Sequence, residues 1–253
     1  MRIRILPSGN GARSDHQFLT TFLVNDSIAI DAGSLGFSAS LAEQRRIRHV
    51  FISHSHIDHV ASLPLFLENV YTADDRCPTI HAAESTLDTL QQDLFNGRVW
   101  PDFVGLSRVC PPFVELKALR EAQTVRIGEI DITPISVDHP VPTFGFLLEE
   151  AGRAAVIVTD TGPTQAIWKR AGLADLRVVF LDASFPESMA ELAELSQHLT
   201  PRRFHDEMAK FDSSARCVAV HIKAAFHDEV VKELEALDDS RLEIGVPGDE
   251  YRV

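Results

Sequence analysis

Side chains that can bind metal ions crowd one short segment of the chain. Residues 53–59 read Ser-His-Ser-His-Ile-Asp-His, so three histidines and one carboxylate fall within six positions. Imidazole and carboxylate groups suit zinc and similar divalent ions. His54 and His56 are two residues apart, so in an extended segment their side chains face the same way. Asp58 and His59 follow the turn and can point at a second ion. The alternative is a polar loop with chance histidines, but four such residues at this density favour a metal site.

Three further residues of the same chemical types stand where apolar runs end. His139 follows a strand in Val-Asp-His-Pro at 137–140, Asp160 ends the run Val-Ile-Val-Thr-Asp, and His221 ends the run Cys-Val-Ala-Val-His. In open α/β sheets, functional residues gather at the carboxyl ends of strands. The sequence therefore marks these three residues as candidate ligands. The alternatives are a strand-end cap for Asp160 and surface histidines for the other two.

The elements that must position these residues alternate along the chain. Short apolar or alternating runs predict strands at 2–6, 20–24, 28–31, 49–53, 125–127, 130–132, 144–148, 155–159, 177–182, 216–222 and 242–246. Helical spacing of apolar residues predicts helices at 34–46, 63–71, 84–96, 187–196, 201–211 and 227–237. Interleaved strands and helices indicate an α/β protein. Because the sequence has no long linker and no fixed-period repeat, we expect a single domain over residues 1–253.

The charge balance restricts the partners. The 253 residues include 24 basic and 37 acidic side chains, which gives a formal net charge of −13. Binding along a phosphate backbone normally needs a basic face, so broad nucleic-acid binding is disfavoured. Acidic membrane surfaces would also repel the chain. A small anionic substrate remains compatible with this charge if the local site is cationic.

Cysteine usage and hydropathy point to the cytoplasm. Cys77, Cys110 and Cys217 are odd in number and far apart, which argues against a disulfide framework and for a reducing compartment. No window of about 18 uninterrupted apolar residues is present, so we expect no membrane-spanning segment. The first apolar stretch is too short for the core of a signal peptide.

The pattern H-x-H-x-D-H, followed by a lone His, a lone Asp and a lone His at strand ends, resembles the metallo-β-lactamase superfamily. That resemblance implies an αββα sandwich with two divalent metal ions at one edge of the sheets, zinc first, with manganese or iron as alternatives. It assigns the first ion to His54, His56 and His139, the second to Asp58, His59 and His221, and a bridging position to Asp160.

Family differences narrow the choice of activity. Oxygen-reducing di-iron members usually carry Glu where His56 stands, and true β-lactamases commonly carry Cys where Asp160 stands. The tRNA-processing members share the ligand set but bear an extended arm, and no Gly/Lys-rich insertion of that kind is visible here. Residues 94–103, Leu-Phe-Asn-Gly-Arg-Val-Trp-Pro-Asp-Phe, are instead similar to a stretch of the class II cyclic-nucleotide phosphodiesterases. Residues 195–201, Leu-Ser-Gln-His-Leu-Thr-Pro, are similar as well.

This closer resemblance implies hydrolysis of a 3′,5′-cyclic nucleotide, cAMP or cGMP, to a 5′-nucleotide through a metal-bridging hydroxide. Two ions can lower the pKa of a shared water toward ~7 and hold the attacking and leaving oxygens. Asp58 would bind the second ion and orient the hydroxide. The alternative activities are hydrolysis of another phosphodiester, such as an RNA 3′ end, or of a lactone or thioester. A metal-free binding module is the third class. Such a module would lack some of the metal ligands, whereas all seven expected positions carry His or Asp here.

His198 is the candidate proton donor to the departing 3′ oxygen. Thr200 suits the N-cap and Pro201 the first position of the helix that follows, and such a helix end favours anions. We therefore expect Thr200 to lie near a bound phosphate. The alternative for His198 is a surface loop histidine.

Asn96 and Trp100 are the remaining candidate substrate contacts. Asn96 can hydrogen-bond the nucleotide or cap its own helix, and Trp100 and Phe103 can stack on a purine or pack in the core. Asp31 is left out of the site as architectural, and Asp182 is either a loop carboxylate or a residue that orients a ligand imidazole. We expect His16, His49, His81, His205 and His227 to be surface or packing residues. The superfamily often dimerises, so a homodimer stays open.

Overall fold

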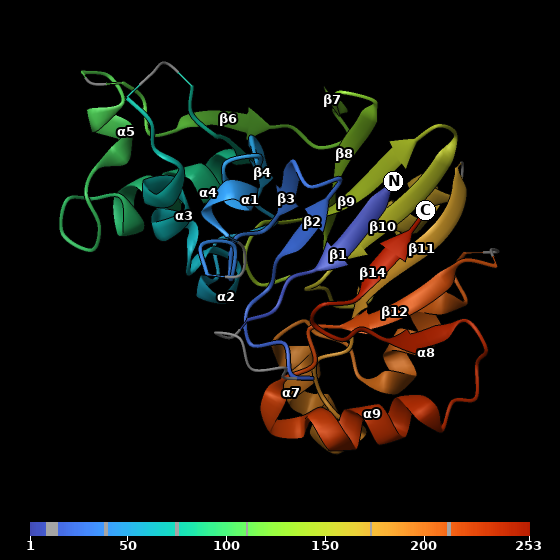
Figure 1. Cartoon of the computed structure of the whole chain (residues 1–253). Helices are drawn as coiled ribbons and strands as arrows, with labels where there is room; N and C mark the ends of the chain where they lie inside the picture. The colour runs from blue at the N-terminus through green and yellow to red at the C-terminus, as the bar shows by residue number, and fades with distance from the viewer. Residues whose placement is uncertain (9–14, 38–39, 74–75, 110, 173, 212–213) are drawn as a thin grey trace. The chain divides into compact units, whose positions relative to one another are not determined.

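The computed structural model describes residues 1–8, 15–37, 40–73, 76–109, 111–172, 174–211 and 214–253 (Figure 1). Its contacts divide the chain into two compact units. The first comprises residues 1–14, 19–119 and 247–252, and the second comprises residues 15–18, 120–246 and 253. Each unit contains one mixed sheet with its own helices.

The first unit is built on a seven-stranded sheet with the order β14-β1-β2-β3-β4-β5-β6. Its strands are β1 (Arg2–Ile5), β2 (Phe22–Val24), β3 (Ile28–Ile30), β4 (His49–Phe51), β5 (Thr79–Ala83), β6 (Glu115–Leu119) and β14 (Glu250–Arg252). The strands from β3 to β6 run parallel, whereas β14, β1, β2 and β3 pair antiparallel. The carboxyl ends of β3 and β4 therefore meet at one edge of this sheet.

The helices of the first unit are short. They are α1 (Leu41–Gln44), α2 (Ile57–Val60), α3 (Leu63–Val70), α4 (Glu84–Thr89), the π-helical turn η1 (Leu90–Leu94) and α5 (Phe103–Leu106). A buried cluster joins apolar residues of β4 and β5 to α3, among them Val50, Ile80, Phe66 and Leu67. Burying side chains of this size contributes about 1.5–3 kcal/mol each, which keeps α3 on the sheet and the preceding turn α2 in place.

The second unit is built on a seven-stranded sheet with the order β13-β12-β11-β10-β9-β8-β7. Its strands are β7 (Val125–Ile127), β8 (Ile130–Val137), β9 (Thr143–Glu150), β10 (Arg153–Val158), β11 (Asp175–Asp182), β12 (Arg216–Val220) and β13 (Leu242–Ile244). The strands from β10 to β13 run parallel, and those from β7 to β10 pair antiparallel. The carboxyl ends of β10, β11 and β12 thus lie side by side.

Helices and short turns complete the second unit. They are α6 (Ala166–Ala171), the short turn η2 (Glu187–Met189), α7 (Ala190–Leu195), α8 (Pro201–Met208), the turn η3 (Ala224–Phe226) and α9 (His227–Glu235). Helix α6 packs on the antiparallel strands β8 and β9. Helices α8 and α9 lie side by side (Figure 1). Phe204 and Met208 from α8 and Val230 from α9 join Val179 and Leu181 of β11 in one buried cluster. This packing holds the loop before α8, which carries His198, against the strand ends.

Most predicted elements are present, and the shortened helix at 34–46 has both a local and a tertiary cause. The predicted helix 34–46 is wrong over its first half: α1 begins at Leu41, because Ser40 and Glu43 form a capping box there. Before it, Ser34 N donates to Thr21 Oγ1 at 3.0 Å and Gly36 N donates to Ser62 Oγ at 2.8 Å, so these donors serve tertiary bonds rather than a helix.

Other elements were absent from the sequence prediction. The predicted helix 84–96 ends at Leu94 through the π-helical turn η1. Strands β5, β6 and β14 and helices α2, α5 and α6 were not predicted. None of the helices in the described residues is long and apolar enough to cross a membrane. Cys77 and Cys217 are free thiols, and Cys110 lies outside the described residues.

Candidate metal centre

In the first unit, the segment after β4 brings its histidines together. The chain runs extended to His56, which has φ −61° and ψ 147°, and then turns into α2 with Asp58 and His59. The ring centroids of His54 and His56 lie 4.6 Å apart, and those of His54 and His59 lie 4.2 Å apart. The Asp58 Oδ2 atom lies 4.0 Å from His59 Nε2. All four residues predicted from the H-x-H-x-D-H pattern are therefore neighbours.

Asp31 holds this segment from the end of β3. Its Oδ2 atom lies 2.7 Å from His59 Nδ1 and accepts from Ser53 Oγ at 2.9 Å, and its Oδ1 atom accepts from Ser53 N at 2.8 Å. Ser53 Oγ lies 3.0 Å from His54 Nδ1. A carboxylate and a hydroxyl thus fix two imidazoles through their Nδ1 atoms, which turns each Nε2 atom away from these partners.

Gly33 makes this arrangement sterically possible. A Cβ atom at this position would lie 2.0 Å from the Asp58 carbonyl oxygen and 2.7 Å from Thr20 N. The backbones meet here because Ala32 N donates to the His59 carbonyl at 2.7 Å and Thr20 N donates to the Asp58 carbonyl at 2.9 Å. The close approach allows only glycine.

In the second unit, three histidines surround Asp160, which follows β10. Asp160 Oδ1 lies 3.5 Å from His221 Nε2, and Asp160 Oδ2 lies 3.9 Å from His139 Nε2 and 4.0 Å from His198 Nε2. Ligand atoms of Asp160, His198 and His221 all lie within 4.8 Å of one another. The candidates His139, Asp160 and His221 are therefore brought together, and His198 joins them.

Asp182 and Ser184 support these histidines at the end of β11. Asp182 Oδ2 lies 2.6 Å from His198 Nδ1, and Ser184 Oγ donates to Asp182 Oδ1 at 2.6 Å. Ser184 Oγ also lies 3.0 Å from His221 Nδ1. An aspartate and a serine again engage the Nδ1 atoms, as Asp31 and Ser53 do in the first unit. Asp182 therefore orients an imidazole, although that imidazole belongs to His198.

The backbone at two of these strand ends is left-handed. Asp31 has φ 61° and His221 has φ 59°, in a region that residues other than glycine adopt infrequently. The His221 conformation is held by two tertiary bonds: its N–H donates to Gln17 Oε1 at 3.1 Å, and its carbonyl accepts from Ser184 Oγ at 3.1 Å. Such strain persists where the surroundings enforce it, and it is concentrated at functional sites.

His198 is buried rather than a surface loop residue. Burial lowers the pKa of His198, but the nearby, hydrogen-bonded Asp182 carboxylate and then Asp160 outweigh burial, so the pKa lies above its usual value. Thr200 is also buried and caps α8, with its Oγ1 atom accepting from Arg203 N at 3.5 Å. The predicted helix start is present, with Thr200 as the N-cap and Pro201 as the first residue of α8. A phosphate near Thr200 stays a prediction.

The structure gives Asn96 and Trp100 local contacts. Asn96 Oδ1 accepts from Arg98 N and Val99 N at 2.9 Å each, so this side chain closes the turn after η1. Trp100 is half-buried and packs against the first unit's core, in which Phe103 stacks on Phe113 with ring centroids 4.4 Å apart. These placements match the capping and packing alternatives, and contact of either residue with substrate stays a prediction.

The second unit contains a cavity with a volume of about 400 Å³. It is lined by Asp138, Gly162, Pro163, Glu194, Gln197 and Arg203. Asp138 precedes His139 and Gln197 precedes His198 in the sequence, so the immediate chain neighbours of both histidines line the cavity. Pockets for small ligands usually span about 300–1,000 Å³. The volume suits a small molecule.

The donors in the two units fit divalent metal ions. His54, His59, His139 and His221 each place Nδ1 beside a protein oxygen, and for His139 this is the Gln197 carbonyl at 3.4 Å. Engaging Nδ1 with oxygen is the usual arrangement around metal-bound histidines. The carboxylates of Asp58 and Asp160 complete a donor set suited to zinc, manganese or iron. The fold and these His/Asp clusters define a metal-dependent hydrolase.

The comparison with families agrees with this class. The family described as "Beta-lactamase superfamily domain" matches residues 22–222. The chain therefore belongs to the metallo-β-lactamase superfamily, and the resemblance seen in the H-x-H-x-D-H pattern is confirmed. That match extends over parts of both units, and the single domain over residues 1–253 stays a prediction.

Individual relatives include phosphodiesterases and ribonucleases. A probable 3′,5′-cyclic-nucleotide phosphodiesterase from Yersinia pestis is 25% identical over 92% of this chain and 83% of the relative. 3′,5′-Cyclic-nucleotide phosphodiesterase 1 from Saccharomyces cerevisiae is 22% identical over 70% of this chain, which spans 57% of that relative. A ribonuclease Z from Haloarcula marismortui is 23% identical over 100% of this chain and 97% of the relative.

A solved structure supports the fold class. Unliganded yeast PDE1 matches with a TM-score of 0.79 at 17% identity, covering 98% of both chains. At this identity the match concerns the fold. Together with the two mixed sheets flanked by helices, it confirms the predicted α/β class of the metallo-β-lactamase type.

Proposed function

We propose that this protein hydrolyses the 3′,5′-cyclic phosphodiester of a cyclic nucleotide, cAMP or cGMP, to a 5′-nucleotide. The observation that carries the proposal is the match to the phosphodiesterase of Yersinia pestis over 92% of this chain. The similar residues 94–103 and 195–201 support it. The chemistry of the two ligand clusters agrees with a hydrolase that uses metal ions.

We propose that the seven predicted ligands together hold two divalent ions, with zinc first and manganese or iron as alternatives. They are His54, His56, His139, Asp58, His59, His221 and, as the bridging residue, Asp160. When bound, such ions supply Lewis acidity toward phosphoryl oxygens and lower the pKa of a bound water. Asp31, Ser53 and Ser184 prepare the ligands by engaging their Nδ1 atoms.

The chain's own residues then serve the reaction in distinct ways. Asp58, which is half-buried, would orient the attacking water. His198 would donate a proton from Nε2 to the departing 3′ oxygen, because Asp182 holds its Nδ1 atom at 2.6 Å and leaves Nε2 on the Asp160 side. The cavity of about 400 Å³ that Asp138 and Gln197 help to line would accept part of the nucleotide.

A substrate panel tests the activity. Full-length protein supplied with zinc or manganese is assayed with cAMP, cGMP, bis(p-nitrophenyl) phosphate, a precursor tRNA 3′ end, a lactone and a thioester. We expect the highest kcat/KM for a cyclic nucleotide, with the 5′-nucleotide identified by chromatography. Turnover confined to the tRNA, the lactone or the thioester would refute the proposal.

Metal removal gives the second test. Treatment with a strong chelator should abolish hydrolysis of the cyclic nucleotide, and added zinc or manganese should restore it. The restored preparation is compared with a mock-treated sample carried through the same buffer exchange. Full activity in protein that elemental analysis shows to be metal-free would exclude a metal-dependent mechanism.

Processing of tRNA 3′ ends is the second candidate function. The observation that favours it is the ribonuclease Z match, which extends over 100% of this chain. The formal net charge of −13 disfavours the grip on a long phosphate backbone that this activity needs. We therefore propose a small cyclic nucleotide as the partner and no broad binding of nucleic acid or membranes. We further propose a cytoplasmic location. A homodimer is the proposed assembly, and sizing in solution tests it.

A further inference from the structure

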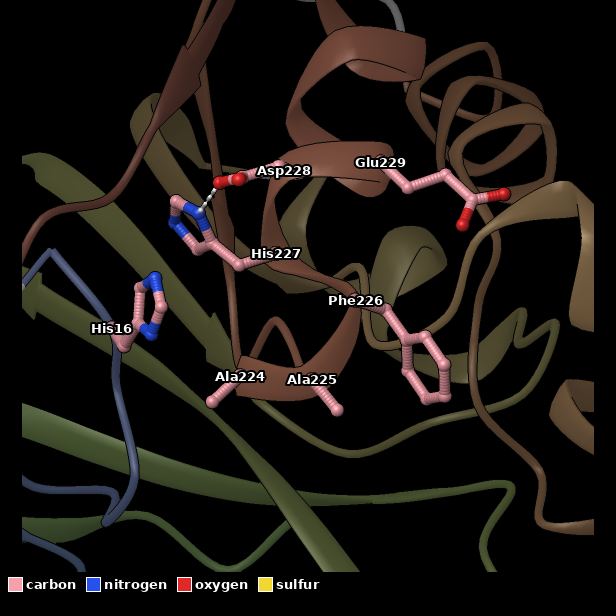
Figure 2. A pocket seen from close by; sticks show the side chains of 7 residues that line it. All are labelled: His16, Ala224, Ala225, Phe226, His227, Asp228 and Glu229. Carbon is pink, nitrogen blue, oxygen red and sulfur yellow. Dashed lines mark hydrogen bonds and ion pairs between the residues drawn. The ribbon is translucent and has the colours of Figure 1, made fainter.

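A second group of metal-ligand side chains lies in the second unit, outside the seven proposed ligands. His16, His227 and Asp228 have ligand atoms that all lie within 4.8 Å of one another. They line a pocket of about 250 Å³, together with Ala224, Ala225, Phe226 and Glu229 (Figure 2). From the sequence, we expected His16 and His227 to be surface or packing residues, and 211 positions separate them in the chain.

The two imidazoles face one another. Their ring centroids lie 4.4 Å apart with an angle of 35° between the ring planes, and His227 Nδ1 lies 3.4 Å from Asp228 Oδ1. Figure 2 shows the His16 ring beside the His227 ring and the Asp228 carboxylate on the other side of His227. Glu229 points away and accepts from Ser188 Oγ at 2.8 Å, so its carboxylate is engaged elsewhere.

Hydrogen bonds tie down the chain next to both histidines. His227 opens α9 directly after the turn η3, in which Phe226 N donates to the Lys223 carbonyl at 2.9 Å. His16 precedes Gln17, whose Oε1 atom accepts from His221 N at 3.1 Å. Gln17 thus contacts the residue after β12, and His227 follows the same strand after the turn η3. A preorganised ligand pair of this kind loses little freedom when an ion binds.

The chemistry of this group selects the ion. Two imidazoles and one carboxylate match the preferences of zinc, nickel and copper rather than those of magnesium or calcium. The amino end of α9 is the positive end of the helix dipole, which by itself disfavours a cation. Asp228 and Glu229 in the first turn place two acidic groups there and oppose that effect. Asp228 is fully exposed, so the site is open to ions and to waters that complete the coordination.

We propose that His16, His227 and Asp228 bind one zinc-type transition-metal ion at a site separate from the hydrolytic centre. The ion joins the segment 15–18 to α9 and thereby supports the Gln17 bond to the strained His221 backbone. This role goes beyond the proposed function, because it requires neither a cyclic nucleotide nor a hydrolytic reaction.

Zinc stoichiometry tests the site in the full chain. Purified protein is stripped with a chelator, reloaded with zinc and desalted, and the zinc per chain is measured by elemental analysis. We expect the double variant His16→Ala/His227→Ala to hold about one ion fewer than the wild type. His205→Ala is the matched control, because His205 Nε2 lies 3.6 Å from Asp239 Oδ2 and this His–Asp pair is likewise outside the seven proposed ligands. Equal zinc in wild type and double variant overturns the proposal.

Chemical protection tests the same site in the unaltered sequence, so that misfolding of a variant cannot decide the outcome. Zinc should protect His16 and His227 from diethyl pyrocarbonate, as measured by peptide mass spectrometry, and should leave His205 reactive. The protection should persist in His54→Ala/His56→Ala, which lacks two proposed ligands of the hydrolytic centre. Equal modification of His16 and His227 with and without zinc overturns the site, whatever the substrate panel shows.

Discussion

At the scale of single residues, the site is organised by hydrogen bonds to the Nδ1 atoms of its histidines. Asp31 engages His59 at 2.7 Å, and Asp182 engages His198 at 2.6 Å. Each carboxylate has a serine beside it that contacts a further histidine, Ser53 for His54 and Ser184 for His221. These oxygens fix the tautomer and direction of the imidazoles, so the residues that do not bind metal still set its affinity.

Removing the imidazole of His198 should slow turnover of the cyclic nucleotide about 10²–10⁴-fold, the usual contribution of a positioned proton donor. Because His198 is not among the seven proposed ligands, metal content should stay the same in His198→Ala. In His198→Gln the amide can still donate to Asp182. This variant therefore separates the loss of the imidazole from the effect of leaving Asp182 unpaired. His205→Ala, on the exposed face of α8, is the control. Unchanged kcat in both His198 variants would remove this residue from the mechanism.

Replacing Asp31 by Asn should weaken metal affinity about 10–100-fold, because the charge that orients His59 is lost. Competition with a chromophoric chelator measures this affinity. Asp26→Asn is a close control: Asp26 lies in the same unit with φ 58°, near the 61° of Asp31, but it pairs with Arg2. Equal affinities in the two variants would show that Asp31 does not orient His59 for the metal.

At the scale of secondary-structure elements, the ligands depend on how strand ends are joined. In the first unit, Asp31 and the histidine segment follow β3 and β4, which run parallel. In the second unit, Asp160 and His221 follow the parallel strands β10 and β12, whereas His139 follows β8 in the antiparallel part of the sheet. The turn α2 is only four residues long, so packing rather than helix propensity must hold it. Its contact with Gly33 provides that packing.

Gly33→Ala should destabilise the protein by about 1–3 kcal/mol, because the added methyl group meets backbone atoms that cannot move independently. Displacement of Asp58 and His59 should also lower the zinc content. Urea unfolding and elemental analysis measure the two effects. Gly128→Ala is the control, since a Cβ there meets nothing within 4 Å and only its φ of 60° is unfavourable. Native zinc content in Gly33→Ala would show that the ligand turn tolerates the methyl group.

At the scale of the whole molecule, a buried histidine couples stability to pH. His81 on β5 stacks on Phe51 with ring centroids 4.3 Å apart, and its Nε2 atom lies 3.1 Å from His49 Nδ1. Burial, then His49 and Lys117, lowers the pKa of His81 to about 4, and Glu115 opposes this only in part. The unfolded chain, with its ordinary pKa near 6.5, therefore binds this proton more readily than the folded protein does.

The free energy of unfolding should therefore be highest above about pH 6.5 and fall as the pH drops toward 4, by at most about 3 kcal/mol from His81. Urea unfolding at pH 7 and at pH 5 measures the loss. His81→Asn should lose less stability than the wild type over this interval, because its side chain does not titrate. His205→Asn should follow the wild type. An identical pH dependence in all three proteins would contradict the assignment.

Local patterns were sufficient for some of these features and insufficient for others. The hairpin around Gly128 and the cap of α8 at Thr200 were predictable, because a turn and an N-cap depend on a few adjacent residues. The helix expected from residue 34 was not predictable, because Ser34 and Gly36 bond to partners elsewhere in the chain. Asp31 was set aside as architectural, although an aspartate at a strand end before Ala-Gly was the available signal.

The sequence by itself determined the kinds of donor and their order, since imidazole and carboxylate chemistry belongs to the side chains and the spacing of residues 54–59 is local. Tertiary structure decided which oxygens support His59 and His221, whereas Ser53 stands next to His54 in the sequence. Asp31 and His59 are 28 residues apart, and Ser184 and His221 are 37 apart. It also decided that His16 lies against His227. Such contacts depend on strand pairing and long-range packing, which side-chain periodicity within one segment does not encode.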